Sequence, residues 1–251
     1  MNSALHETAT SKTAGATKQR RGKIILLTLL AILAWIVLNL GLVLAAWMRS
    51  YYAPIEPVPR AASLDLRTDT SVPGRVITII ATKPTPSKGD FIGHLWLEWP
   101  ETPPLAKPGT REGGYYAQDQ IQAVKAMAAA LILPWGAVTG QDFVPGLMKV
   151  DDGWWRHLQV HVRVDEARYQ AALAVDRRWR SENRYRLRPS LIGPDKGKTF
   201  GCQDYVFDVA AALGLDTAHR SWTEFPMGSF LRFAQVNKID MTGRDIRSLD
   251  H

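Results

Sequence analysis

The longest hydrophobic pattern in the chain is an uncharged apolar run at residues 24–47. At a helical rise of about 1.5 Å per residue, this run is long enough to cross a hydrocarbon core of about 30 Å. Basic residues gather before it, and only Arg49 and Arg60 follow closely. The preceding basic residues are Lys12, Lys18, Arg20, Arg21 and Lys23. We therefore predict a single-pass inner-membrane protein with a cytoplasmic N-terminus and a periplasmic or otherwise extracytoplasmic C-terminal domain.

A cleaved signal peptide is the alternative interpretation of this run. Its apolar region would be shorter and would end in small residues, whereas this run ends at Trp47 and is followed by Met48 and Arg49.

The segments around the apolar run divide the chain. Residues 1–23 are rich in Ser, Thr, Ala and Lys without apolar periodicity, and are predicted to form a disordered basic tail. Residues 48–73 carry four prolines and few large apolar side chains, which indicates a semi-rigid linker. The remaining segments are a globular domain at residues 74–240 and a frayed tail at residues 241–251.

Four segments of the globular domain have strand patterns. Residues 75–82 (RVITIIAT) are largely β-branched, which predicts a strand buried on both faces. In residues 90–99, alternation places His94, Trp96 and Glu98 on one face and Gly93, Leu95, Leu97 and Trp99 on the other. Residues 113–117 form a short third strand, and residues 157–164 (HLQVHVRV) alternate as a half-buried strand.

Helical spacing appears between and after these strands. It is found at residues 121–132, at residues 202–213 and near residues 230–235, whereas residues 133–156 look irregular. Asp165 caps a further helix that ends near Asn183. Its buried stripe is Tyr169, Ala172, Leu173, Asp176 and Trp179. Short connections between the strands favour a mostly antiparallel sheet with helices packed around it, an α+β fold.

Charge and cysteine content limit the classes of function that the sequence supports. The net charge of +7 owes much to the basic tail, and no zinc-ligand spacing or aromatic-basic motif is present, so nucleic acid is not an expected partner. With 1 cysteine, the domain forms no internal disulfide. We expect neither a metal nor another cofactor.

The cysteine lies at a position that favours a reactive thiol. Cys202 follows Gly201 and falls in the first turn of the helix predicted at residues 202–213. Backbone N–H groups and the helix dipole at that position favour the thiolate, the form that acts as a nucleophile. A buried cysteine that only fills space is the alternative.

A thiolate nucleophile needs a base, and histidine is the best base near neutral pH. His94 is the first choice, because it follows Gly93 within a strong strand pattern. A histidine satisfied by the core is the alternative for that residue. His161 is a weaker choice, since it shares a polar face with His157, Gln159 and Arg163 that we expect to be solvated.

The order of these motifs resembles the circularly permuted NlpC/P60 group of papain-like cysteine enzymes. The likeness covers about residues 74–215 and includes GHLWLE around His94, GYY at residues 114–116, YRL from Tyr185 and GCQDYV around Cys202. It implies a papain-like domain in which Cys202 is the nucleophile and His94 the general base. Gly201 stands where the group usually has asparagine.

The resemblance also suggests where further site residues lie. The third polar residue would come from the strand after the histidine, where Tyr115, Tyr116 and Gln118 are candidates. Tyr185 resembles a tyrosine that helps to bind the oxyanion, although its separation from Cys202 is longer than in the group.

The sequence therefore favours a membrane-anchored cysteine hydrolase that forms an acyl-enzyme thioester. Its substrate would be a peptide or other amide, peptidoglycan, or an acyl ester of a lipid, with the bilayer as a second partner through residues 24–47. Two alternatives stay open: a catalytically inactive papain-like binding module of the cell envelope, and a lipid acyltransferase.

Overall fold

The computed structural model divides the chain into two units, Met1–Val43 and Leu44–His251. It describes residues 4–53, 60–86, 90, 92–119, 121–126, 143–150, 155–187, 189, 197–217 and 224–241, with side chains from residue 20 onward. The expected frayed tail therefore lies almost wholly outside the described residues, as do His219 and Trp154.

The first helix, α1 (Ala4–Tyr51), includes the apolar run. Within it, the segment Arg20–Tyr51 is long and apolar enough to cross a membrane. The expectation of a disordered tail is wrong for residues 4–23, which are helical. Alanine, lysine and arginine recur there and have high helix propensity, which allows the helix to extend toward the N-terminus.

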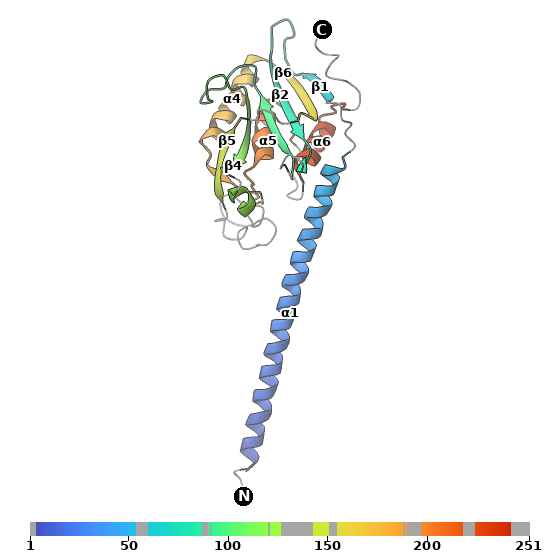
Figure 1. Cartoon of the computed structure of the whole chain (residues 1–251), viewed down its shortest axis with the longest axis vertical. Helices are drawn as coiled ribbons and strands as arrows, with labels where there is room; N and C mark the ends of the chain where they lie inside the picture. The colour runs from blue at the N-terminus through green and yellow to red at the C-terminus, as the bar shows by residue number, and fades with distance from the viewer. Residues whose placement is uncertain are drawn as a thin grey trace. The chain divides into compact units, whose positions relative to one another are not determined.

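The second unit contains a seven-stranded sheet of order β1-β6-β2-β3-β4-β5-β7 (Figure 1). The strands are β1 (Arg60–Asp65), β2 (Arg75–Thr82), β3 (His94–Glu98), β4 (Glu112–Ala117), β5 (Val144–Lys149), β6 (Leu158–Val164) and β7 (Arg184–Tyr185). All neighbours are antiparallel except β1 and β6, which are parallel. The α+β class is confirmed, with more strands than expected.

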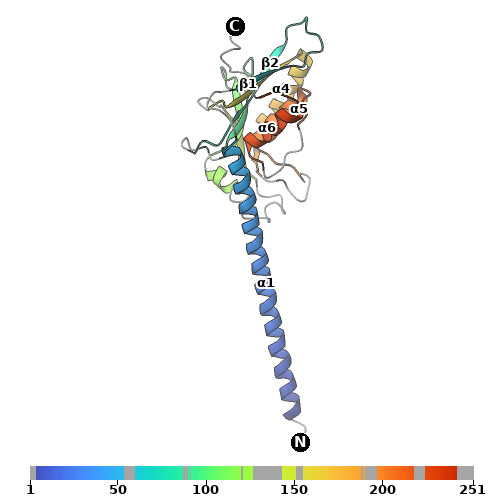
Figure 2. The ribbon, with the colours of Figure 1, turned by 90° about the vertical axis from the view of Figure 1, so that its right-hand side faces the viewer.

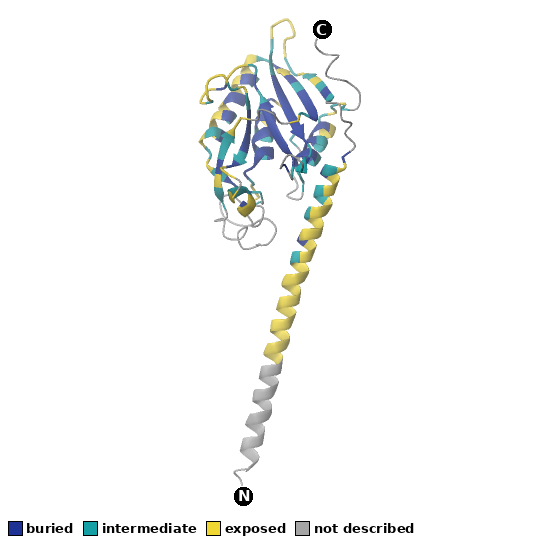
Figure 3. Cartoon of the chain, viewed as in Figure 1, coloured by how far each residue is buried: buried dark blue, intermediate teal, exposed yellow. Residues whose placement is uncertain are grey.

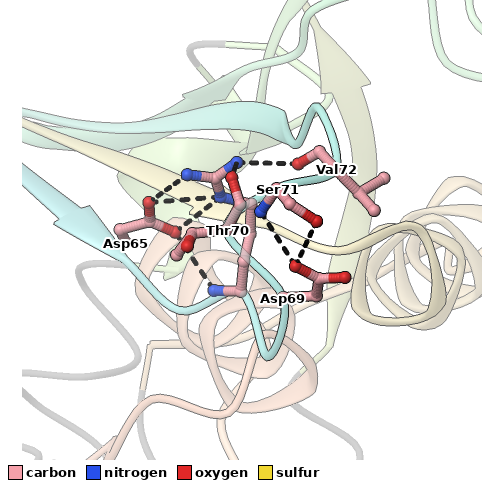
Figure 4. Close-up of polar contacts among 6 residues, drawn as sticks. Asp65, Asp69, Thr70, Ser71 and Val72 are labelled. Carbon is pink, nitrogen blue, oxygen red and sulfur yellow. Dashed lines mark hydrogen bonds and ion pairs between the residues drawn. The ribbon is translucent and has the colours of Figure 1, made fainter.

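Part of the segment expected to form a linker belongs to the globular unit. Ala53 belongs to the hydrophobic core, and residues 60–65 form β1 at the sheet edge. After β1 the chain turns tightly, because the Arg67 guanidinium binds the Asp65 carboxylate and the carbonyls of Thr70 and Val72 (Figure 4). The proline content predicted an extended connection. Residues 60–65 instead pair with strand β6 and therefore belong to the sheet.

Helices α4 (Glu166–Ser181), α5 (Cys202–Ala212) and α6 (Pro226–Val236) gather on one side of the sheet (Figure 2). The α4 helix begins where predicted, since the Asp165 carboxylate accepts the Arg168 N–H at 2.9 Å. Its buried residues are the predicted stripe: Tyr169, Ala172, Leu173, Asp176 and Trp179.

The sheet face toward these helices forms the main core. It includes Ile77, Ile79, Leu95, Leu97, Val160 and Val162, together with Tyr205, Val206, Val209 and Phe230 from the helices. We call it the helix face and the other the outer face. The outer face is also largely buried, and Ile80 and Trp96 are fully enclosed there (Figure 3).

Candidate functional site

A tight turn fixes the start of β3. The Asp90 carboxylate accepts the backbone N–H groups of Gly93 at 2.8 Å and Ile92 at 3.2 Å. Gly93 has φ +77°, and a Cβ there would lie 2.5 Å from the Thr82 carbonyl oxygen, so only glycine fits. His94 follows directly as the first residue of β3, opposite Thr82 of β2.

The His94 ring lies on the outer face. Its centroid is 4.0 Å from that of Tyr116 and 5.9 Å from that of Trp96, with both pairs stacked. The neighbouring residues Leu95 and Tyr115 belong to the core on the helix face. Because side chains alternate along a strand, His94 points away from the helices.

Cys202 lies on the other side of the sheet. It is the first residue of α5, which packs against β3 and β4, and its side chain is buried. The Asp204 carboxylate holds the turn before it by accepting the Gly201 N–H at 2.8 Å and the Thr199 hydroxyl at 2.6 Å. The prediction of a helix that begins at Cys202 is confirmed.

The two residues lie at the same end of the sheet. The end of β4 pairs with β5 (Ala117 with Gly146), and the start of β5 pairs with β7 (Val144 with Tyr185). The Tyr185 ring in turn approaches Gly201, at 3.9 Å from a Cβ built there. The His94 ring lies on the outer face and α5 packs on the helix face, so the pairing of Cys202 with His94 stays a prediction.

The candidate third residues divide between the two faces. Tyr116 stacks on His94, with the Lys149 ammonium 5.8 Å from its ring centroid. Tyr115 is a packing residue, since its hydroxyl lies 2.8 Å from the Arg184 carbonyl oxygen and burial raises its pKa. Gln118 is exposed beyond β4.

Tyr185 is the one candidate close to Cys202. It is buried, stacks on Tyr115 and lies beside the turn at Gly201. The resemblance described above implies a place for Tyr185 near Cys202. No described contact tests whether Tyr185 binds an oxyanion, so that role stays a prediction.

The polar face of β6 differs from the expectation of a solvated face. His157 and Gln159 are buried, and His161 is half-buried with its Nδ1 3.0 Å from the Thr78 hydroxyl. Burial lowers the pKa of His161, partly offset by the Glu98 carboxylate. These side chains belong to the outer face, at a strand that lies between β1 and β2.

Sequence reasoning missed two ionisable residues near His94. His157 Nδ1 lies 2.9 Å from the Thr82 hydroxyl, and burial, followed by the Lys83 ammonium, lowers its pKa to about 4. Burial raises the pKa of Asp90, an effect opposed by its backbone hydrogen bonds and by His94. The signal for Asp90 was the Asp-x-x-Gly spacing, which is typical of a side chain that closes its own turn.

Metal ligation has little support at this site. Within the part of the chain that the structure describes, no group of three or more His, Cys, Asp or Glu side chains could hold a metal ion.

No family model matches this chain, and neither a curated protein nor a solved structure matches it.

Proposed function

We propose that this chain is a membrane-anchored binding domain of the cell envelope that does not use Cys202 and His94 as a catalytic pair. The observation that carries the proposal is that the His94 ring stacks on Tyr116 on the outer face, whereas Cys202 begins a helix that packs on the helix face. General-base catalysis requires the base within hydrogen-bond reach of the nucleophile. The cytoplasmic N-terminus and the extracytoplasmic position of the globular unit belong to the same proposal.

The described surface offers an aromatic platform for a ligand. Trp96 and Trp99 are buried and cannot line an open groove, but Trp155 is 52% exposed. Its ring is held by a stack on His157 with centroids 6.0 Å apart. Exposed tryptophans on a fixed support are frequent anchors of binding, because the ring loses little conformational entropy.

Charge beside this platform favours an anionic ligand. The Lys83 backbone N–H lies 3.4 Å from His157 Nδ1, and the Lys83 ammonium lowers the pKa of His157, which supports the Trp155 ring. Peptidoglycan combines sugar rings, which stack on tryptophan, with peptide carboxylates, which pair with lysine. It is therefore the envelope ligand that we propose.

Binding to purified peptidoglycan sacculi tests the proposal. In co-sedimentation of the full chain in detergent, Trp155→Ala should weaken binding about tenfold or more, whereas Trp155→Phe should retain most of it. Cys202→Ala should bind as the wild type does. The proposal fails if the wild type does not sediment, or if sacculi release fragments in a reaction that Cys202→Ala abolishes.

The second candidate function is a papain-like cysteine hydrolase, or an acyltransferase with the same residues. One observation favours it: Cys202 opens a helix at the end of the sheet where β3 begins with His94. It requires the His94 ring to move around the strand end to reach the thiol. A thiol whose reactivity depends on His94 would favour this candidate over the binding domain.

A further inference from the structure

The last turn of α1 is built into the globular unit. Ser50 is buried, and its hydroxyl lies 3.7 Å from a Cβ built at Gly228 in α6. Ala53, two residues past the helix, belongs to the core. The last turn of α1 therefore packs at the start of α6.

The starts of α5 and α6 lie together at this junction. The Ser229 hydroxyl donates to Gln203 Oε1 at 2.7 Å, and Gln203 Nε2 donates to the Glu224 carbonyl oxygen at 3.2 Å. Gln203 directly follows Cys202. The end of the sheet that carries Cys202 and His94 is therefore the end at which the last turn of α1 packs.

An aromatic cluster lies at the same end. Trp47 stacks on Tyr51 with centroids 4.9 Å apart, and Tyr52 packs edge-on to Tyr51 at 5.0 Å. Tyr52 is 69% exposed. Tryptophan and tyrosine prefer the membrane–water interface, and the apolar run ends at Trp47.

A helical turn at residues 121–126 adds a second apolar contact. It follows β4, whose last residues flank His94, and it lies at the same end of the globular unit as the last turn of α1 (Figures 1 and 3). Ile121 and Val124 are 67% and 59% exposed. Three residues apart, they share one side of the helical turn, as in helices that lie in a membrane surface.

We propose that this end of the globular unit rests on the lipid headgroup layer, with Tyr51, Tyr52, Ile121 and Val124 in contact with lipid. The surface fits a bilayer because its apolar and aromatic side chains continue directly from the apolar run that ends at Trp47. The Cys202 and His94 end then faces the membrane. Trp155 belongs to the same end, because His157, on which it stacks, bonds Thr82 opposite His94, so the Trp155 platform would take its ligand on the outer face, close to the bilayer.

Spin labels on the full chain in nanodiscs of phosphatidylcholine and phosphatidylglycerol test this contact. In a Cys202→Ser background, single cysteines replace Val124, Tyr52 or Leu105. Leu105 is a matched control, since it is 76% exposed and lies in the loop between β3 and β4, at the opposite end of the sheet. Each labelled variant must keep the wild-type circular dichroism spectrum.

The labels at positions 124 and 52 should be protected from a water-soluble nickel relaxant, with collision rates at least about threefold below that at position 105. Their accessibility to oxygen should rise, as at a lipid interface. A label at position 124 that meets the nickel relaxant as often as the label at position 105 would overturn the proposal, whatever the label at position 52 reports. Peptidoglycan binding is measured separately, so either proposal can fail alone.

Discussion

Asp176→Ala should lower the free energy of unfolding by about 3–5 kcal/mol, the cost of breaking a buried ion pair by removing one partner. Asp176 is fully buried between α4 and α5. Its carboxylate accepts the Arg180 Nε–H at 2.6 Å and the Tyr205 hydroxyl at 2.7 Å. Without it, a largely buried guanidinium and a buried hydroxyl lose their acceptor, and the two helices lose one of their polar contacts.

The chain offers a matched control on the same helix. Arg178 pairs with Asp208 at 2.6 Å, but the Arg178 side chain is 66% exposed and that of Asp208 46% exposed. Arg178→Ala should therefore cost less than about 1 kcal/mol. Urea unfolding of the full chain in detergent, followed by tryptophan fluorescence, measures both variants. If Asp176→Ala costs no more than Arg178→Ala, the network does not stabilise the helix pair as described.

Acidification from pH 6.5 to about pH 4 should cost the wild type about 2–3 kcal/mol of stability through His157 alone. Burial and then Lys83 lower the pKa of His157 to about 4 in the folded chain. Between these pH values His157 takes up a proton in the unfolded state but stays largely neutral in the folded state. The free energy of unfolding therefore falls as the pH falls. Below about pH 4 both states are protonated and this loss levels off.

His157→Asn isolates this contribution, because its amide lies where Nδ1 bonds the Thr82 hydroxyl but does not titrate. The measurement is the urea midpoint against pH for both proteins. The wild type should lose more stability than His157→Asn between pH 6.5 and pH 4. Parallel curves would show that His157 is protonated equally well in the folded and unfolded chain. His161, whose pKa is also lowered, is present in both proteins and cancels in the comparison.

Segments with strong local signals were predictable from the sequence. The β-branched run Arg75–Thr82 has the predicted bounds, and α4 has its predicted cap at Asp165. β1 and β5 were not expected, since neither has a clear alternation of apolar and polar residues. They are strands because β6 and β4 supply their hydrogen bonds, and a partner far away in sequence leaves no local signal.

The candidate site was also only partly predictable from the sequence. Alternation correctly placed His94 with Trp96 and Glu98, but it did not say which face the helices cover. The apolar pattern of the strand carried this information. Leu95, Leu97 and Trp99 form its more apolar face, and the helices pack on that face because the contact buries apolar surface. Because Cys202 begins one of those helices, the same pattern puts the His94 side chain on the face opposite the helix that carries the thiol.

The most direct test of this separation is the alkylation rate of Cys202 against pH in the full chain, repeated with His94→Ala. Cys202 is the only cysteine, so the rate reports on one thiol. We predict slow alkylation in the folded protein, with the same dependence on pH in both. A fast-reacting thiolate at neutral pH that disappears in His94→Ala would contradict the separation and would establish the Cys202–His94 pair.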